Sequence, residues 1–588
     1  MGLTIGVLIA VGAWAGWHLY TLGTNALHLA GLVDTVQQHA KQGDVPALID
    51  DLYDVHRYSV AAYNAASDPT VMALHAMPGI GDDLRAAREV TRVARDLTAA
   101  TGTLASMAPR VTGNQILTED GRIDLTLIGT VHTAMTELAS AAEAGSKRLG
   151  SLDQGSLLPQ IGEPIDRLVG WLEQVPGAVD RAEPYLQLLP LLLGENDERT
   201  WFVIMQNLDE ARPSGGLLAS WLVLHANNGL IEVLAQGTND DLTATGNVDY
   251  SHAMDASYRT LWGDNLSGWL SMNLSANFPD NARLMRDAWN ARGEAQVDGV
   301  VSFGQGTLPY LAAAVGPVDA GERSIAPADL EEYLRVGVYR DYEDPDTKDK
   351  MVASLMIQVF DKLMAGNLNL GYFLDTVTGY ESADRVQMWS ADPTIQQTIA
   401  AADLSGEFPS AEGPVSTVRL VNAGGNKLDT FMDLDVAYLL GDCEMDEEYD
   451  VEWRTSTMTV KLTNSVPDGL PPYMTGRLDL IDEGVDPSRV VVGSNRDFVV
   501  IYAPVGATIA SVTVDGAEAY VHGAELSGRE VALVDVETNP GTSRIIKVTW
   551  SEPATDSVGR ALPTSPEVVL PPLANPVTLS LEPGNTCP

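Results

Sequence analysis

WFVIMQNLDEARPSGGLLASWLVLHANNGLIEVLAQ, residues 201–236, contains apolar runs that are separated by polar residues and glycines. Runs of this length bounded by turn residues are typical of β-strands. The pattern predicts strands at 201–207, 217–225 and 230–236. An Asn-Asn-Gly turn joins the last two as a hairpin. Before the second strand, Arg212 stands next to a proline, a serine and two glycines, which raises the question of what an arginine does at the edge of a sheet.

The segments that follow alternate between strand and helix patterns. VDGVVSF at 297–303 predicts a strand, GQGTLPYLAAAVG at 304–316 a short helix that stops at a glycine, and MVASLMIQVFDKLMAG at 351–366 a strongly apolar helix. Alternating elements indicate an α/β or α+β domain whose sheet is covered by helices. We expect this domain to occupy residues 190–414.

After residue 414 the sequence changes to short alternating runs with Gly, Pro, Asn and Asp between them. Examples are DTFMDLDVAYLL, MTVKLTN, TIASVTVDG, REVALVDVET and TSRIIKVTW. This spacing of strands and turns is typical of an antiparallel β-sandwich. We therefore predict a sandwich domain over residues 415–588, ending in a Pro-rich tail from Pro563.

Residues 34–189 are rich in Ala, Leu and acidic residues, with Pro and Gly at the breaks, and predict a bundle or stalk of helices. In DDLRAAREVTRVARDLTAATGTL, residues 82–104, the apolar residues fall in an arc about 140° wide at helical spacing. The opposite side carries Arg85, Arg88, Arg92 and Arg95. Two interpretations stay open for this stripe: a solvated face that pairs with neighbouring acids, or a surface for an anionic polymer or headgroup.

Residues 1–33 contain no Asp, Glu, Lys or Arg, and LTIGVLIAVGAWAGWHLYTL, residues 3–22, matches the ~20 apolar residues that span a bilayer. We therefore predict a transmembrane anchor over residues 1–33, with Trp14, Trp17 and Tyr20 at the membrane interface. The alternatives are a cleaved signal peptide, which lacks its usual basic start and cleavage site here, and an N-terminal core helix of a soluble protein. Without Lys or Arg, the charge pattern gives no orientation.

Composition narrows the range of partners. The formal net charge is -44, from 80 acidic and 36 basic side chains, which argues against a nucleic-acid partner because phosphate backbones are bound by Lys and Arg.

At 588 residues the chain is too long for a single hydrophobic core, since a domain has roughly 100–200 residues. The two cysteines, Cys443 and Cys587, exclude a disulfide scaffold and Cys-rich metal sites. Spacing alone leaves open whether they pair.

Standard catalytic motifs are absent from the sequence. It contains no Walker phosphate loop, HExxH, paired CxxC or GxSxG, and Gly304-x-Gly306 lacks the third glycine of a dinucleotide site. DYEDPDTKDK, residues 341–350, concentrates carboxylates, which are hard oxygen donors for Mg²⁺ or Ca²⁺, but the glycine of an EF-hand loop is missing. A solvated acidic loop is the alternative for this segment.

Several stretches stand out together: QNLDEARPSGG (206–216), SANFPDNARLMRDAW (275–289), VDGVVSFGQGTLPYLAAAVGPV (297–318), YRDYEDPDTKDKM (339–351) and VNAGGNKLDTFMDLDVAY (421–438). In this combination the chain resembles the bacterial envelope family known as domain of unknown function 4012. The resemblance covers residues 190–540, and the helical part before them is similar to the anchored layout of that family. The family name carries no activity.

The order of elements further resembles, more distantly, the LytR-CpsA-Psr ligases of Gram-positive bacteria. This resemblance implies transfer of a glycopolymer from a polyprenyl pyrophosphate carrier to the cell wall, with arginines and magnesium-binding aspartates. Arg212 takes the place of an arginine in the first motif of those ligases, but the residues after it lack the acidic partner. The second motif falls near Asp240 and Asp241, which keep the acids and lack the arginine. A later motif aligns loosely with Arg340, Asp341, Asp346 and Lys348.

A diphosphate ligand would explain the arginine at the sheet edge. A guanidinium can hold two phosphate oxygens at once, and glycines let backbone N–H groups approach the same anion. The expected phosphate-binding residues are Arg212, Ser214, Gly215, Gly216 and Lys348, the expected catalytic residues are Arg212, Asp240, Asp241 and Arg340, and the expected Mg²⁺ ligands are Asp240, Asp241 and Asp346. In the alternative, Arg212 pairs with Asp209 or Glu210 and the glycines only turn the chain.

We therefore expect a single-pass membrane protein of the cell envelope, anchored in the lipid bilayer with most of its chain extracytoplasmic. Its central domain is expected to bind a glycopolymer linked to a lipid pyrophosphate. The domain could also transfer that polymer to peptidoglycan, which would be a phosphotransferase reaction with Mg²⁺. Because the Arg-Asp pairs of the ligases are missing, the sequence does not decide whether this transfer occurs. The alternative is a non-catalytic scaffold or sensor that binds neighbouring wall components or proteins. A ligase requires its arginines and acids to converge in one cleft beside an apolar groove.

Overall fold

The structure is a computed structural model, and it divides the chain into two compact units. The first consists mainly of the residues up to Asp197, and the second mainly of those from Glu198 onward. The described residues are 2–42, 45–112, 116–153, 155, 157–244, 246, 248–250, 253–254, 256–263, 268–365, 386–409, 412–446, 451–482, 484–486 and 489–586. The prediction of a multidomain chain with helices first and mixed sheets after them is confirmed.

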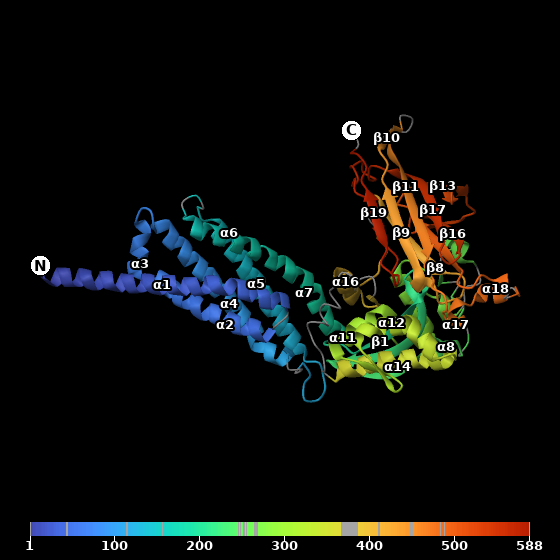
Figure 1. Cartoon of the computed structure of the whole chain (residues 1–588), viewed down its shortest axis with the longest axis horizontal. Helices are drawn as coiled ribbons and strands as arrows, with labels where there is room; N and C mark the ends of the chain where they lie inside the picture. The colour runs from blue at the N-terminus through green and yellow to red at the C-terminus, as the bar shows by residue number, and fades with distance from the viewer. Residues whose placement is uncertain are drawn as a thin grey trace. The chain divides into compact units, whose positions relative to one another are not determined.

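The first unit is helical, as the sequence predicts (Figure 1). Its long helices are α1 (Gly2–Gln42), α2 (Val45–Ala66), α4 (Gly81–Thr112), α5 (Leu125–Gly150), α6 (Pro159–Leu172) and α7 (Gln174–Leu192), and α3 (Pro69–Ala73) is a single turn. The apolar face predicted for 82–104 packs inward from α4. Its Val93 and Leu97 are buried in one core with Leu149 of α5 and Leu172 of α6.

The arginine stripe on α4 is paired within the same unit. Arg85 contacts Asp82, Arg88 contacts Glu89, and Arg92 and Arg95 both contact Asp96. Two of these guanidiniums, those of Arg88 and Arg95, also lie over the ring of Tyr63. The pairing with neighbouring acids is therefore the interpretation of this stripe that the contacts favour.

The N-terminal helix α1 includes the segment for which a membrane anchor was expected. From Trp14 onward α1 packs on its neighbours: the Trp14 Nε1 donates to Asp68 Oδ2 at 3.2 Å, and Leu22 is buried with Ala62 and Ala66 of α2. The side chains of residues 1–10 lie outside the described residues. Among the helices that the structure describes, none has the length and hydropathy of a membrane span, so the transmembrane helix predicted over 1–33 is not supported.

The second unit contains a mixed five-stranded sheet in the order β3-β2-β1-β4-β7. Its strands are β1 (Arg199–Arg212), β2 (Gly215–Asn227), β3 (Leu230–Thr238), β4 (Gly299–Gly304) and β7 (Val386–Ser390). β1 pairs antiparallel with β2 and parallel with β4. The three-strand prediction for residues 201–236 is confirmed, and each strand is longer than its apolar run.

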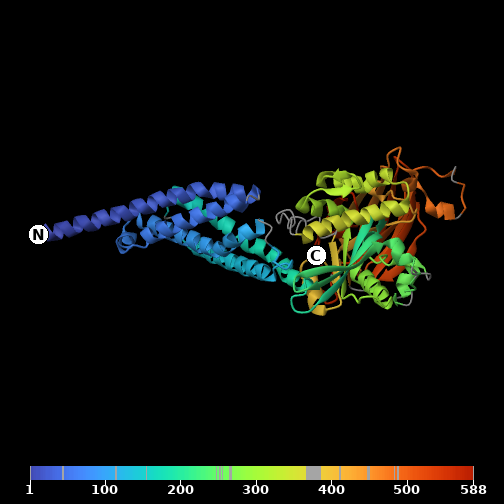
Figure 2. The ribbon, with the colours of Figure 1, turned by 90° about the horizontal axis from the view of Figure 1, so that it is seen from below.

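Helices accompany this sheet, as expected for the α/β or α+β class. They are α8 (Asn239–Thr243), α9 (Ala256–Trp262), α10 (Phe278–Ala291), α11 (Leu308–Val315), α12 (Pro327–Glu332), α13 (Val338–Asp341), α14 (Pro345–Met364) and α16 (Pro393–Ala401). One face of the sheet contributes to a core rich in aromatic residues. The centre of the Trp289 ring lies 5.1 Å from that of Phe202 and 5.0 Å from that of Trp221. Figure 2 shows the yellow helix α14 alongside the green strands.

Apart from β5 (Val318–Ala320) and β6 (Arg323–Ile325), which form a two-stranded sheet of their own, the remaining strands form the two sheets of the predicted sandwich. One sheet has the order β14-β13-β17-β11-β9-β19, with β10 paired to β11, and the other has the order β15-β16-β12-β8-β18. The strands are β8 (Val415–Asn422), β9 (Met432–Leu439), β10 (Cys443–Asp446), β11 (Val451–Asn464), β12 (Asn495–Tyr502), β13 (Thr508–Val514), β14 (Ala517–Glu518), β15 (His522–Leu526), β16 (Arg529–Thr538), β17 (Ser543–Pro553), β18 (Glu567–Val569) and β19 (Thr578–Glu582). Both sheets contribute to a core that includes Val499, Tyr438 and Trp550.

The Pro-rich tail is part of this sandwich. β18 pairs parallel with β8, and β19 pairs parallel with β9, so the tail forms an edge strand of each sheet, and the sandwich is not antiparallel throughout as predicted. The Asn585 side chain then accepts a hydrogen bond from the Cys443 N–H at 2.7 Å. Cys443 is disulfide-bonded, and Cys587, the only other cysteine in the sequence, lies outside the described residues.

The turn between β1 and β2 requires its glycines. Arg212 pairs with Gly215, which has a φ of +138° that side chains rarely adopt, and Ala211 pairs with Gly216. A Cβ on Gly216 would lie 2.0 Å from the Asn207 carbonyl oxygen. The glycines of the predicted phosphate loop therefore have a structural reason to be there.

Replacing Gly216 by Ala should lower the free energy of unfolding by about 1–3 kcal/mol, because the close atoms are backbone and cannot move aside easily. Gly523→Ala is the control, since its Cβ would meet nothing closer than 3.8 Å, and it should stay within about 0.5 kcal/mol of the wild type. Urea denaturation followed by circular dichroism measures both. Equal stability of the two variants would contradict the close approach.

Candidate functional site

The end of β1 contains a bulge that re-aims its side chains. Asn207 pairs with Leu217 and Ala211 with Gly216, so the residues between them, Leu208 to Glu210, have no partner on β2. The parallel pairing of β1 and β4 ends at Gln206 and Gly304, just before the bulge. Bulges often redirect functional side chains, and the carboxyl ends of parallel strands are where α/β proteins bind ligands. The bulge is therefore the starting point of the candidate site.

The bulge meets the sandwich through a buried ion pair. Glu210 contacts Lys427 from the loop after β8, and the side chains of both are less than a tenth exposed, at 8% and 9%. Burial lowers the pKa of Lys427, but Glu210, Tyr473 and Asp349 together outweigh it, and the pKa lies above its ordinary value. The Lys427 ammonium also lies 5.4 Å from the centre of the Tyr473 ring.

A second contact between the same two parts runs through Asp429. Its carboxylate accepts from the Ala211 N–H at 2.5 Å, from Asn422 Nδ2 at 3.0 Å and from Asn495 Nδ2 at 2.6 Å. Asn495 also donates to the buried carboxyl of Asp497. Burial raises the pKa of both Asp429 and Asp497, and two carboxyls in contact favour sharing a proton.

We call this set of contacts between residues 208–212 and residues 422–430 the junction. Arg212 lies inside it and is half-buried. Its Nη1 donates to the Ala211 carbonyl at 2.9 Å and to the Asn422 carbonyl at 3.4 Å. Burial lowers the pKa of Arg212, while Glu210 and Asp429 act in the opposite direction. The arginine thus neutralises acids of the junction and satisfies carbonyl groups.

The other predicted phosphate-binding residues of the turn are engaged as well. The Ser214 hydroxyl is buried and accepts from Asn281 Nδ2 at 3.0 Å. The Gly216 N–H donates to Gln206 Oε1 at 3.2 Å, and the Gly216 carbonyl accepts from Asn273 at 2.6 Å. These groups hold the turn against α10 and the residues before it.

The predicted metal-binding acids lie near one another. Burial raises the pKa of Asp240, and the negative charges of Asp349, Asp346 and Asp241 raise it further. Asp241 caps α8, because its Oδ2 accepts from the Thr238 N–H at 2.8 Å. No group of three or more His, Cys, Asp or Glu residues suited to holding a metal occurs in the part of the chain that the structure describes.

Lys348 connects these acids to the junction. It is buried, its Nζ lies 2.6 Å from Asp349 Oδ1, and it lies 5.0 Å and 5.2 Å from the ring centres of Tyr339 and Tyr473. Lys348 and Lys427 therefore both lie over the Tyr473 ring, so the charges around Lys348 are close to those of the junction. Arg340, at the end of α13, is exposed.

Asp209 is a buried carboxyl that sequence reasoning named only as a partner of Arg212. Its Oδ2 accepts from the Tyr339 hydroxyl at 3.0 Å, and its N–H donates to Asn207 Oδ1 at 3.0 Å. Burial raises the pKa of Asp209 to about 7. Lys427 and Asp429 lie in the stretch 421–438. This stretch contributed to the family resemblance, but no site residue was predicted in it.

The comparisons with known proteins agree with that resemblance. The family model described as "Protein of unknown function (DUF4012)" matches residues 196–339, from just before β1 to Tyr339. This part of the chain is therefore a domain of that family, as predicted. No curated protein and no solved structure matches the chain, and the more distant resemblance to the LytR-CpsA-Psr ligases is not confirmed.

Replacing Lys427 by Met should lower the free energy of unfolding by about 3–5 kcal/mol, since it leaves the buried Glu210 without its counter-charge. Lys461→Met is the matched control, because Lys461 and Asp435 form a half-exposed pair, with side chains 45% and 48% exposed, that should contribute less than about 1 kcal/mol. Urea denaturation measures both. A Lys427→Met variant as stable as the control would contradict the role of the pair.

The raised pKa of Asp209 predicts a pH-dependent stability. The folded chain keeps the proton up to about pH 7, whereas the unfolded chain loses it near the ordinary value of 3.8. The free energy of unfolding should therefore fall by about 2–3 kcal/mol between pH 5 and pH 7 from this group. Asp209→Asn should remove that part of the fall, and Asp287→Asn at an exposed site should not. Equal pH profiles for both variants would contradict the prediction.

Proposed function

We propose that this chain is a non-catalytic protein of the bacterial cell envelope, a scaffold or sensor that binds neighbouring wall components or proteins. The observation that supports this proposal is the way in which the cations in and beside the junction are used. Arg212, Lys348 and Lys427 all make internal contacts, and the acids beside them match their charges.

The energies favour this function over diphosphate binding at the junction. Taking one partner from a buried ion pair costs about 3–5 kcal/mol, because the other charge stays buried without compensation. A diphosphate that recruited Lys427 would have to offset this cost before it gained any affinity. It would also face the negative charges of Glu210 and Asp429. The junction is therefore better suited to holding two folded parts together than to gripping an anion.

An extracytoplasmic location is part of the proposal. Disulfides persist in oxidising compartments and are rare in the cytoplasm, and Cys443 is disulfide-bonded. The strong negative charge of the chain suits a solvated exterior. We include attachment to the membrane through the N-terminal segment as the accompanying hypothesis.

A second function, binding or transfer of a glycopolymer on a polyprenyl pyrophosphate, is favoured by one observation. Asp240 lies within electrostatic reach of Asp346 and Asp349, and Lys348 lies beside them. Acids that repel one another become favourable when a divalent cation binds between them. In this case Mg²⁺ would be held at Asp240 and Asp346 and would present its charge to a diphosphate.

One experiment on the full chain separates the two functions. Binding of a polyprenyl-pyrophosphate sugar is measured with and without Mg²⁺ for the wild type, Arg212→Ala, Asp240→Asn and Arg283→Ala. Arg283 is the control because its pair with Asp280 is exposed. The scaffold function predicts no Mg²⁺-dependent binding, and a loss of about 1–3 kcal/mol of stability in Arg212→Ala alone.

The contrary result is equally clear. The wild type would bind the sugar only with Mg²⁺, and Asp240→Asn would lose this binding. Because Asp240 is exposed, its substitution should not unfold the chain. This result would support the glycopolymer function instead of the scaffold function. Binding lost only in Arg212→Ala, with stability unchanged, would show that the arginine grips the ligand.

A further inference from the structure

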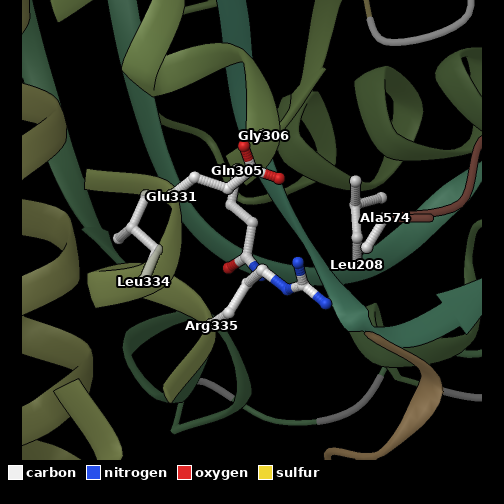
Figure 3. A pocket seen from close by; sticks show the side chains of 7 residues that line it. All are labelled: Leu208, Gln305, Gly306, Glu331, Leu334, Arg335 and Ala574. Atoms are coloured by element: carbon white, nitrogen blue, oxygen red, sulfur yellow. The ribbon is translucent and has the colours of Figure 1, made fainter. Parts of the chain in front are cut away.

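A small hollow lies at the carboxyl ends of β1 and β4, next to the bulge. It is lined by Leu208, Gln305, Gly306, Glu331, Leu334, Arg335 and Ala574 (Figure 3). A second hollow shares Leu208 and is lined by Gln206, Gln387 and Pro572, among others. In the structure the first hollow has room for about one water molecule.

Several buried polar atoms around these hollows have no hydrogen-bond partner among the described residues. They are Gln206 Nε2, Asp209 Oδ1, Gln305 Nε2, Thr307 Oγ1 and Gln387 Oε1. Gln206, Gln305 and Thr307 are less than a tenth exposed, at 3%, 6% and 4%. The Gln305 side chain lies beside the Asp209 carboxyl and acts to lower its pKa. A buried polar group without a partner costs about 1–3 kcal/mol, so several together point to a missing ligand.

The charges around the first hollow favour a neutral ligand. Arg335 already donates to Thr430 Oγ1 at 2.5 Å and to the Thr430 carbonyl at 2.8 Å, so its guanidinium is largely occupied. Glu331 on the wall would repel an anion, and the Asp209 carboxyl, which keeps its proton up to about pH 7, adds no positive charge to attract one. The unpartnered atoms include both donors and acceptors, and a hydroxyl group serves both because it donates and accepts.

A segment of the chain's own C-terminal part lines both hollows. We call residues 570–577, between β18 and β19, the C-terminal strap. Ala574 lines the first hollow and Pro572 the second. Figure 3 shows the amide end of Gln305 beside the Arg335 side chain, with Leu208 and Ala574 on the other side.

The centre of the strap is held by long hydrogen bonds. Asn575 Oδ1 accepts from Arg335 at 3.3 Å, and Asn575 Nδ2 donates to the Met432 carbonyl at 3.4 Å and to Asp433 at 3.3 Å. Bonds of this length are weaker than the usual ~2.9 Å contact. Leu573 of the strap is 7% exposed and packs in the sandwich core, so the strap is attached there and through its flanking strands, and only the Asn575 side chain beside the hollow is held by long hydrogen bonds.

We propose that the hollow is a binding site for a neutral, hydroxyl-bearing small molecule, such as a sugar, and that the C-terminal strap covers this site in the resting chain. The ligand hydroxyls would hydrogen-bond to Gln305, Thr307 and Asp209 when the strap lifts. A site of this kind requires neither catalysis nor membrane attachment.

The test measures binding of glycerol, glucose and N-acetylglucosamine to the full chain by ligand-observed NMR and calorimetry, with inorganic phosphate and acetate as anionic comparators. The neutral probes should bind the wild type and the anions should not. Asn575→Ala should bind them about two- to tenfold more tightly, because the strap lifts more easily. Gln305→Leu should bind them at least about tenfold more weakly, and Gln397→Leu at an exposed position should match the wild type.

Three outcomes overturn the proposal. The neutral probes bind neither the wild type nor Asn575→Ala, the anions bind more tightly than the sugars, or Gln305→Leu binds as the wild type does. If Gln305→Leu does not fold, Thr307→Val carries the same expectation. Failure of these probes leaves the scaffold function intact, since that function is tested by the polyprenyl-pyrophosphate titration and the stability of Arg212→Ala.

Discussion

The buried ion pair between Glu210 and Lys427 is the contact on which the second unit depends. It joins the bulge of β1 to the loop after β8, and the Ala211 to Asp429 bond runs beside it. Arg335 adds a third connection by holding the Thr430 backbone. Each buried charge is retained only with its partner, because a bare ion in this environment costs several kcal/mol. The sheet and the sandwich are therefore held as one body, and the junction gives the arginine of the sheet edge its role.

The sequence predicted the elements well because their signals are local. The apolar runs at 201–236 and the short alternating runs after 414 match strands in the structure. The bulge was not predictable, since a register shift leaves the apolar pattern of β1 unchanged. Lys427 was missed for a related reason: its partner Glu210 is 217 positions away, and no local pattern connects them. The expectation for Arg212 rested on residue types, which do not reveal that the neighbouring acids and carbonyls surround it.

The acids of the second unit show how position decides chemistry. Asp209, Asp429 and Asp497 are buried, and burial raises the pKa of each. Asp240 is exposed, and the acids around it contribute to its raised pKa. A bound cation would relieve the repulsion between these acids. Cations in contact with buried acids are structural, whereas the exposed acids and the unpartnered amides near the strap have capacity left for ligands. We propose that these groups, and not the junction, are where ligands bind.

The most direct test of this account is native-state hydrogen exchange of the full chain at increasing denaturant. If the junction makes one body of the sheet and the sandwich, the slowest amides of β1 and β4 should share one opening free energy with those of β8, β12 and β16. In a Lys427→Met variant the common value should drop for all five strands together. The account would be contradicted if the sheet and the sandwich of the wild type had separate opening free energies and the substitution changed neither value.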